Sequence, residues 1–288
     1  MMVKQITVIF ALLTCLVESE AIGQETKELK LSGFGFWIQE IPRGADASLK
    51  LKHVWLIANR ALDSNLTLEV IIAPQGPPKI IHNLSLEWRK PFAGIDFVKV
   101  GRFGPEFSLG TNYYRVDRNP TVLYSGADQV VVARSNGLQV AGTISGFVWK
   151  VAAFSGDRLG GNINTLNDGK WDKYLLGRYT FGEFLSCGLS QRLGPVHARN
   201  INFVGCLDSL QVEAEAITSK DSTNYSVLGI HKTLPWLTTL VRYENVKAEN
   251  RITPGFIIHL PHDCDIKCNA VIAQTGLETV LGQFILRW

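Results

Sequence analysis

Hydrophobic and polar residues alternate with a period of two along most of this chain. Residues 65–73 show the pattern clearly, because one face carries four aliphatic side chains and the other carries Thr67 and Glu69. Such alternation is typical of a β-strand with one apolar and one polar face. It recurs in residues 84–89, 210–217, 236–244 and 279–288. No stretch sustains a helical period, so the pattern predicts an all-β protein.

Turn residues divide the chain so that tight and longer connections alternate. Seven connections are tight, at residues 61–65, 91–94, 144–146, 182–183, 207–209, 233–235 and 261–265. The connections between them are longer, at residues 42–47, 74–83, 104–129, 156–171, 194–198, 219–224, 248–251 and 275–278. Seven tight turns join fourteen strands, and residues 29–40 and 279–288 complete about sixteen. Fourteen or twelve strands are the alternatives, because several segments are short.

Alternation alone does not distinguish a soluble sandwich from a membrane barrel. A sandwich buries its apolar faces between two sheets, whereas an outer-membrane barrel turns them toward lipid and lines its lumen with polar residues. Tight turns at one end and longer loops at the other favour the barrel. The chain is 46% hydrophobic, yet no stretch after the N-terminal segment reaches the roughly 18 apolar residues of a membrane helix. We therefore predict one antiparallel transmembrane β-barrel over residues 22–288.

The N-terminal segment, residues 1–21, has the composition of a secretion signal. Lys4 precedes an apolar run that extends to Val17, and Ser19-Glu20-Ala21 offers a cleavage site with small residues at its ends. Cleavage after Gly23 is the alternative. A buried helix or a lipoprotein signal at Cys15 fits this segment less well. We expect export and a final location in the bacterial outer membrane, in contact with its lipids.

Five segments resemble the phosphate-selective porin O/P family. The most specific is 95–109, in which Gly101-Arg102-Phe103 resembles the end of the strand that opens the pore-folding loop of that family. The others follow in the family's order, at residues 136–142 with 147–156, 210–215, 255–261 and 283–288. The resemblance implies a sixteen-stranded, homotrimeric porin, and the terminal Trp288 in place of phenylalanine still suits the barrel assembly machinery. The chain is far shorter than typical members, and phosphate selectivity does not carry over.

Basic residues exceed acidic ones on the predicted lumen face. The inward bases are Lys50, Lys52, Arg60, Arg89, Lys150, Arg178, Arg192, Arg242, Lys267 and Arg287. The inward acids are Glu69, Glu87, Glu213, Glu215 and Glu244. Basic rings in a narrow channel favour anions, and the alternative is that these bases pair with the acids and only solvate the wall. A formal net charge of +3 is too mild for a nucleic-acid binder.

The connection over residues 104–129 is the one long loop of an economical chain, which indicates a functional loop. It contains Tyr113, Tyr114, Arg115, Asp117 and Arg118. If the loop folds inward, these residues constrict the lumen and offer guanidinium groups to an oxyanion. The alternative is a solvated loop whose tyrosines cover the rim.

The predicted function is therefore a passive pore for small solutes that prefers small anionic solutes, phosphate or other oxyanions among them. The predicted anion-binding residues are Lys50, Lys52, Arg115, Arg118, Lys150, Arg178, Arg192 and Arg242. A structural or plugged barrel without an open channel is the alternative. No nucleophile–base motif occurs, so we expect no enzyme and no cofactor.

The segment from His259 to Cys268 holds histidine and cysteine side chains, but their spacing matches no standard zinc site. The family resemblance places this segment on a periplasmic turn. There Cys264 and Cys268 either close a small disulfide or remain free thiols. Strand parity places Cys187 toward lipid and Cys206 toward the lumen, so we expect no bond between them.

Overall fold

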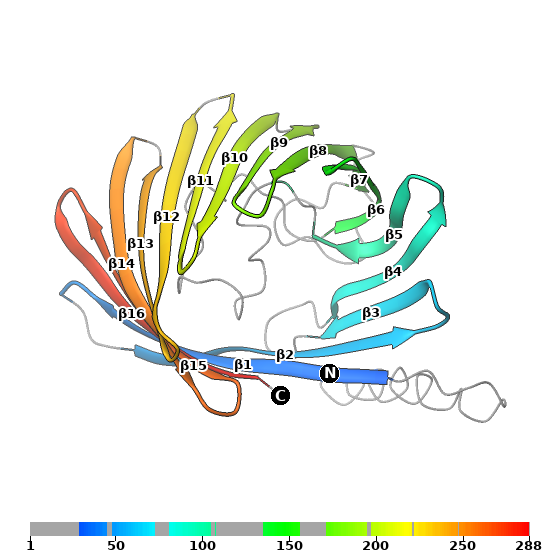
Figure 1. Cartoon of the computed structure of the whole chain (residues 1–288). Helices are drawn as coiled ribbons and strands as arrows, with labels where there is room; N and C mark the ends of the chain where they lie inside the picture. The colour runs from blue at the N-terminus through cyan, green and yellow to red at the C-terminus, as the bar shows by residue number, and fades with distance from the viewer. Residues whose placement is uncertain are drawn as a thin grey trace.

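The structure is a computed structural model that describes residues 29–44, 48–72, 81–104, 107, 135–155, 171–194, 197–220, 222–246 and 248–287. Sixteen antiparallel strands form one closed barrel in which each strand pairs with its sequence neighbours and β1 pairs with β16 (Figure 1). The described residues contain no helix that is long and apolar enough to cross a membrane. The strands are β1 (Leu29–Pro42), β2 (Ser48–Ala61), β3 (Leu66–Ile72), β4 (Ile81–Phe92), β5 (Ile95–Phe103), β6 (Ser135–Ile144), β7 (Phe147–Ser155), β8 (Trp171–Phe181), β9 (Leu185–Leu193), β10 (Ala198–Leu207), β11 (Leu210–Ser219), β12 (Thr223–Leu234), β13 (Leu237–Val246), β14 (Glu249–Leu260), β15 (Cys264–Ala273) and β16 (Gly276–Arg287).

All seven tight turns predicted from the sequence join strands at one end of the barrel, and the predicted sixteen strands are confirmed. Their local chemistry explains them. Ser145 and Gly146, between β6 and β7, have φ angles of 48° and 80°, and two positive φ angles in succession are what a two-residue type I′ hairpin requires. Asp63 accepts hydrogen bonds from the backbone amides of Asn65 (2.6 Å) and Leu66 (2.7 Å), an Asx turn. Both ends of the strand series therefore lie at the tight-turn end.

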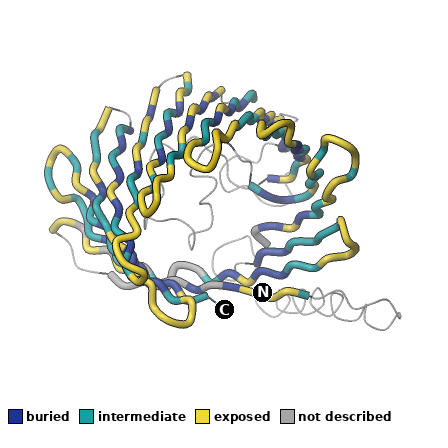
Figure 2. The backbone as a smooth tube through the Cα atoms, in the orientation of Figure 1, coloured by how far each residue is buried: buried dark blue, intermediate teal, exposed yellow. Residues whose placement is uncertain are grey.

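The two faces of the barrel wall differ as the alternation predicts (Figure 2). Outward positions are exposed and apolar: Leu56, Leu84, Trp88, Val100, Leu138, Val151, Leu175, Leu189, Ile201, Val212, Val227, Val241, Ile252, Ile266 and Phe284. Many buried lumen positions are polar: Asn83, Ser85, Gln139, Asp172, Ser190, Asn200, Asn202, Glu213, Glu215, Thr238, Arg242, Glu244, Thr253, Lys267, Asn269 and Gln283. Apolar side chains such as Ile71, Ile217 and Ile285 lie among them on the same face. This inverted arrangement is that of a transmembrane barrel, in which lipid covers the apolar face.

A β-bulge in β2 corrects one predicted orientation. The β1–β2 register shifts between Phe36 and Trp37, where β2 carries Lys52 as the extra residue. Such a shift inverts the facing of every later position in the strand. Arg60 consequently lies opposite Leu68 on the lipid-facing side, so its predicted place in the lumen was wrong.

The same bulge gives Lys50 and Lys52, both predicted to face the lumen, different positions in the β1–β2 pairing. Lys50 pairs with Ile38, which also pairs with the lumen-facing Gln283 of β16. Lys52 has no partner in the β1–β2 register. Their side chains lie outside the described residues, so their predicted anion-binding role stays a prediction.

Candidate pore and its lining

The long connection after β5 enters the lumen at its start. Phe107, four residues beyond the end of β5, is fully buried at 0% exposure. The Ser190 hydroxyl donates a hydrogen bond to the Phe107 carbonyl oxygen. Ser190 is a lumen position, because it pairs with Leu176 on β8 and with Asn200 on β10. The chain therefore crosses from the β5 rim to the inner wall formed by β8 to β10.

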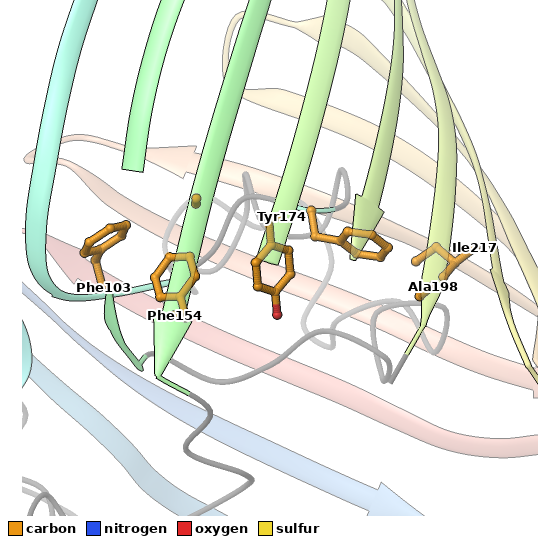
Figure 3. Packing of buried hydrophobic residues seen from close by; sticks show 7 residues of the cluster. Phe103, Phe154, Tyr174, Ala198 and Ile217 are labelled. Atoms are coloured by element: carbon orange, nitrogen blue, oxygen red, sulfur yellow. The ribbon is translucent and has the colours of Figure 1, made fainter. Parts of the chain in front are cut away.

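An aromatic cluster holds this crossing in place (Figure 3). Phe103 and Phe154 make an edge-to-face contact with ring centroids 4.9 Å apart, and Phe154 makes another with Tyr174 at 5.5 Å. Phe107 lies 6.1 Å from the Tyr174 ring, also edge to face. Ala152, Ala198 and Ile217 complete the buried cluster. Edge-to-face pairs at such distances stabilise beyond simple burial, so the lumen wall carries an apolar anchor for the start of the loop.

A glycine on the neighbouring strand makes room for this cluster. Gly137 pairs with Phe154, and a Cβ atom at Gly137 would overlap the Phe154 ring. Because Gly137 has no side chain, the Phe154 ring can lie directly against the backbone of β6 at this point.

The residues predicted to constrict the pore, Tyr113, Tyr114, Arg115, Asp117 and Arg118, lie outside the described residues. The position of Phe107 is the described part of the same connection, and it lies inside the barrel. The described part of the chain resumes with β6 at Ser135. Constriction by the loop stays a prediction.

Arg192 is a lumen residue whose charge is matched by a buried acid. Its Nε and Nη2 atoms lie 3.1 and 3.0 Å from the two carboxylate oxygens of Asp172, a bidentate pair. The guanidinium carbon also lies 5.9 Å above the Tyr174 ring. Both charged side chains are almost fully buried, at 6% and 3% exposure. Asp172 was not predicted as a lumen residue, because the preceding connection was expected to end at residue 171 and the alternation was not extended to Asp172.

Other lumen bases are also paired. Arg242 and Glu244, on successive lumen positions of β13, approach to 2.7 Å. Arg89 pairs with Glu87 in the same way at 2.9 Å. On β5, the Lys99 amine lies 3.8 Å from both Glu69 and Glu87. The predicted alternative, in which lumen bases pair with acids, therefore describes this part of the wall.

Lys150 of β7 and Arg178 of β8 differ in their surroundings from the lumen bases that pair with acids. Both face the lumen, since Lys150 pairs with Leu176 and Arg178 with Val148. The Lys150 amine lies 5.9 Å from the Phe97 ring centroid. Within the described part of the chain, Arg178 has no ion pair, and its buried Nε atom has no hydrogen-bond partner. Among the described residues, Arg178 is therefore a predicted site residue whose lumen-facing charge has no acidic partner.

At the tight-turn end, a hydrogen-bonded series links four strands. The Thr238 hydroxyl lies 3.0 Å from His259 Nε2, and His259 Nδ1 lies 2.8 Å from Asp265. Arg287 Nη2 donates to the other Asp265 oxygen at 2.6 Å. A cleft of about 570 Å³ opens beside the series, between the β12–β13 turn and His259. Each member is held by its neighbours, as a cross-strand structural network requires.

The four cysteines within the described residues, Cys187, Cys206, Cys264 and Cys268, are free thiols. Cys264 and Cys268 pair with Leu286 and Gly282 on the outward face of one strand. Four residues of a strand span about 13 Å, whereas a disulfide needs Cα atoms within about 7 Å. The disulfide alternative for this pair is therefore wrong. The register also sets Cys187 beside the outward Phe203 and Cys206 beside the inward Gln211, on opposite faces as predicted.

Comparison with solved structures places the fold among outer-membrane porins. OmpT of Vibrio cholerae, an outer-membrane protein in its trimer form, superposes with a TM-score of 0.67 and 9% identity over 92% of this chain and 100% of that chain. An engineered variant of the porin from Rh. blastica gives 0.64 and 11%, over 91% and 100%. A loop-deletion variant of the same OmpT gives 0.65 and 10%, over 92% and 100%.

The other two comparisons found no relative. No protein-family model matches the sequence, and no curated protein matches it. The structural likeness, at about one residue in ten identical, establishes the barrel architecture. It does not identify the phosphate-selective family that the sequence resembles.

Proposed function

We propose that this chain forms a passive diffusion pore for small hydrophilic solutes in the bacterial outer membrane. The observation that carries the proposal is a closed sixteen-stranded barrel whose inner wall carries many polar and charged side chains and whose outer wall is mainly apolar. A polar lumen lets hydrated solutes pass, and an apolar outer face of this kind is stable only in lipid. Residues 1–21 serve as the export signal in this proposal, and residues 22–288 form the barrel.

The selectivity we propose is a weak preference for anions. Ion pairs match several of the predicted lumen bases, as between Arg192 and Asp172 or Arg242 and Glu244. Arg178 retains its charge toward the lumen, and Arg115 and Arg118 add two more bases if the loop continues inward from Phe107. A few uncompensated bases near a narrow point bias permeation toward anions without a dedicated binding site.

The assembled state we propose is a homotrimer. A trimer form is stated for the OmpT structure that this chain resembles in fold. The exposed apolar outer faces of the barrel suit either lipid or a neighbouring copy.

Reversal potential across a salt gradient, measured on the refolded protein in a planar bilayer, tests the proposal. We expect steady conductance and a potential on the anion-selective side. The double variant Arg115→Ala/Arg118→Ala and the single variant Arg178→Gln should each reduce the anion preference, by about twofold for one uncompensated base. Lys90→Gln, on an exposed residue of the β4–β5 turn end, is the control and should leave it unchanged.

The outcomes separate the alternatives. Conductance without anion preference would support the diffusion pore and contradict the proposed effect of the basic residues on selectivity. A folded barrel that does not conduct supports the plugged barrel, for which the inward course of the chain at Phe107 is the favouring observation.

A further inference from the structure

The outward face of the barrel carries an exception to its apolar character at the long-loop end of β9 to β12. Four directly opposed outward positions are polar there: Gln191, Arg199, Thr218 and Thr223. They form one continuous row across four strands, and the Thr218 and Thr223 hydroxyl oxygens lie 3.3 Å apart. On β8 the position opposite Gln191 is the apolar Leu175, and Lys173 lies two residues further toward the long-loop end, opposite Leu193. The four opposed residues and Lys173 together form an outward-facing polar group, called the polar row below.

The two bases of the polar row are exposed, and neither has an ion-pair or hydrogen-bond partner among the residues that the structure describes. They differ in this from lumen bases such as Arg192 and Arg242, which are matched by acids. No acidic side chain belongs to the row. A positive charge on the outside of a barrel that no described acidic side chain matches is available to an anionic group outside the protein.

The positions next to the row, one step toward the barrel middle, are apolar and exposed. Leu189, Ile201 and Tyr225 show 62%, 47% and 39% exposure, and Ala216 lies between the last two. The row therefore lies at the boundary between hydrocarbon and headgroups. Because the tight turns of such barrels face the periplasm, the long-loop end faces outward, and this boundary belongs to the outer leaflet.

We propose that Lys173 and Arg199 form a binding site for a phosphate-bearing lipid of the outer leaflet. The guanidinium of Arg199 pairs with a phosphate oxygen in the bidentate manner, and the Lys173 ammonium supplies a second charge. The hydroxyls of Thr218 and Thr223 and the Gln191 amide donate hydrogen bonds to the headgroup. The acyl chains lie over Leu189, Ile201 and Tyr225. The inference rests on the outer-membrane location in the proposed function, and it adds a lipid partner to it.

Lipid binding by the refolded full chain tests this site. The probe is diphosphoryl lipid A carrying a fluorescent label, titrated into the barrel in neutral detergent, with fully dephosphorylated lipid A beside it. We expect saturable binding of the phosphorylated lipid only. The variant Lys173→Gln/Arg199→Gln should weaken it roughly tenfold, since each base near a lipid surface contributes to binding. Inorganic phosphate at millimolar concentration should not compete, which separates a lipid site from a free-phosphate site.

The control variant Lys90→Gln/Lys232→Gln removes the same net charge at the tight-turn end and should bind as the unaltered chain does. Retained heat-modifiable migration in gels shows that each variant is folded. Equal weakening in both double variants would overturn the proposal, as would unchanged binding by Lys173→Gln/Arg199→Gln or equal binding of the dephosphorylated lipid. The titration needs no ion flow, so a barrel that fails to conduct but binds through Lys173 and Arg199 refutes the pore and keeps the lipid site.

Discussion

The hydroxyl of Ser190 donates its hydrogen bond to the carbonyl of Phe107, a residue 83 positions earlier in the chain. This single contact joins the connection after β5 to the lumen wall of β9. It places Phe107 inside the barrel. If the rest of the connection follows Phe107 into the lumen, as predicted, the size of the open lumen depends on this anchor.

Phe107→Ala should release this anchor. The fully buried ring and its contact with Tyr174 are lost, which should cost about 2–4 kcal/mol of unfolding free energy. Single-channel conductance should rise and become noisier as the segment leaves the wall. Ser190→Ala, which removes one hydrogen bond and about 1 kcal/mol, should have a smaller effect in the same direction. Unchanged conductance in Phe107→Ala would show that the segment does not limit the pore.

Asp172→Asn should leave the Arg192 guanidinium buried without its counter-charge. Breaking a buried pair from one side costs about 3–5 kcal/mol in a protein interior, and the wet lumen should place the loss at the lower end. The reversal potential should shift toward stronger anion preference. Urea unfolding in lipid vesicles measures the first effect and bilayer recording the second. The double variant Asp172→Asn/Arg192→Gln should recover part of both; no recovery would mean that the two residues are not coupled.

Gly137→Ala should destabilise the barrel by roughly 1–3 kcal/mol, because the new methyl group meets the Phe154 ring. Gly205→Ala is the matched control, since the nearest atom to a Cβ there is 3.9 Å away. Comparing the urea midpoints of the two variants separates the effect of steric overlap with the Phe154 ring from the general effect of adding a methyl group to a strand. Equal midpoints would contradict the proposed packing.

The thiols of Cys264 and Cys268 should both react with an apolar maleimide without prior reduction, because the strand geometry keeps them apart. Mass spectrometry of the refolded protein counts the adducts. Omission of reductant should leave this count unchanged for the pair. A mass two units lower with neither thiol labelled would demonstrate the bond that the register excludes.

The fold was predictable from the sequence to a large extent, because it depends on local signals. Alternation fixes which face of a strand meets lipid, and turn residues such as Ser145 and Gly146 fix where strands end. The facing of Arg60 was not predictable in this way. A bulge at Lys52 inverts the strand parity without any local sequence signal.

The pore lining was predictable in composition but not in pairing. Alternation correctly placed Arg192 and Arg242 in the lumen, yet their charge depends on the acids across or along the strand. Asp172 and Asp265 lie within two residues of connections, where strand ends are hardest to locate. The path of the chain at Phe107 depends on contacts with strands far along the sequence, and residue periodicity carries no information on them.

The pairing of β1 with β16 has a consequence for how this molecule forms. The first strand of the barrel finds its second partner only when the last strand arrives, so the wall has two unsatisfied edges until the chain is complete. Contacts between such distant segments are slow to form. Until it closes, such a barrel can therefore associate with other copies of the chain through its unpaired strand edges. Pairing of residues 283–287 of β16 with β1, from Phe34 to Ile38, closes the barrel and satisfies both strand edges.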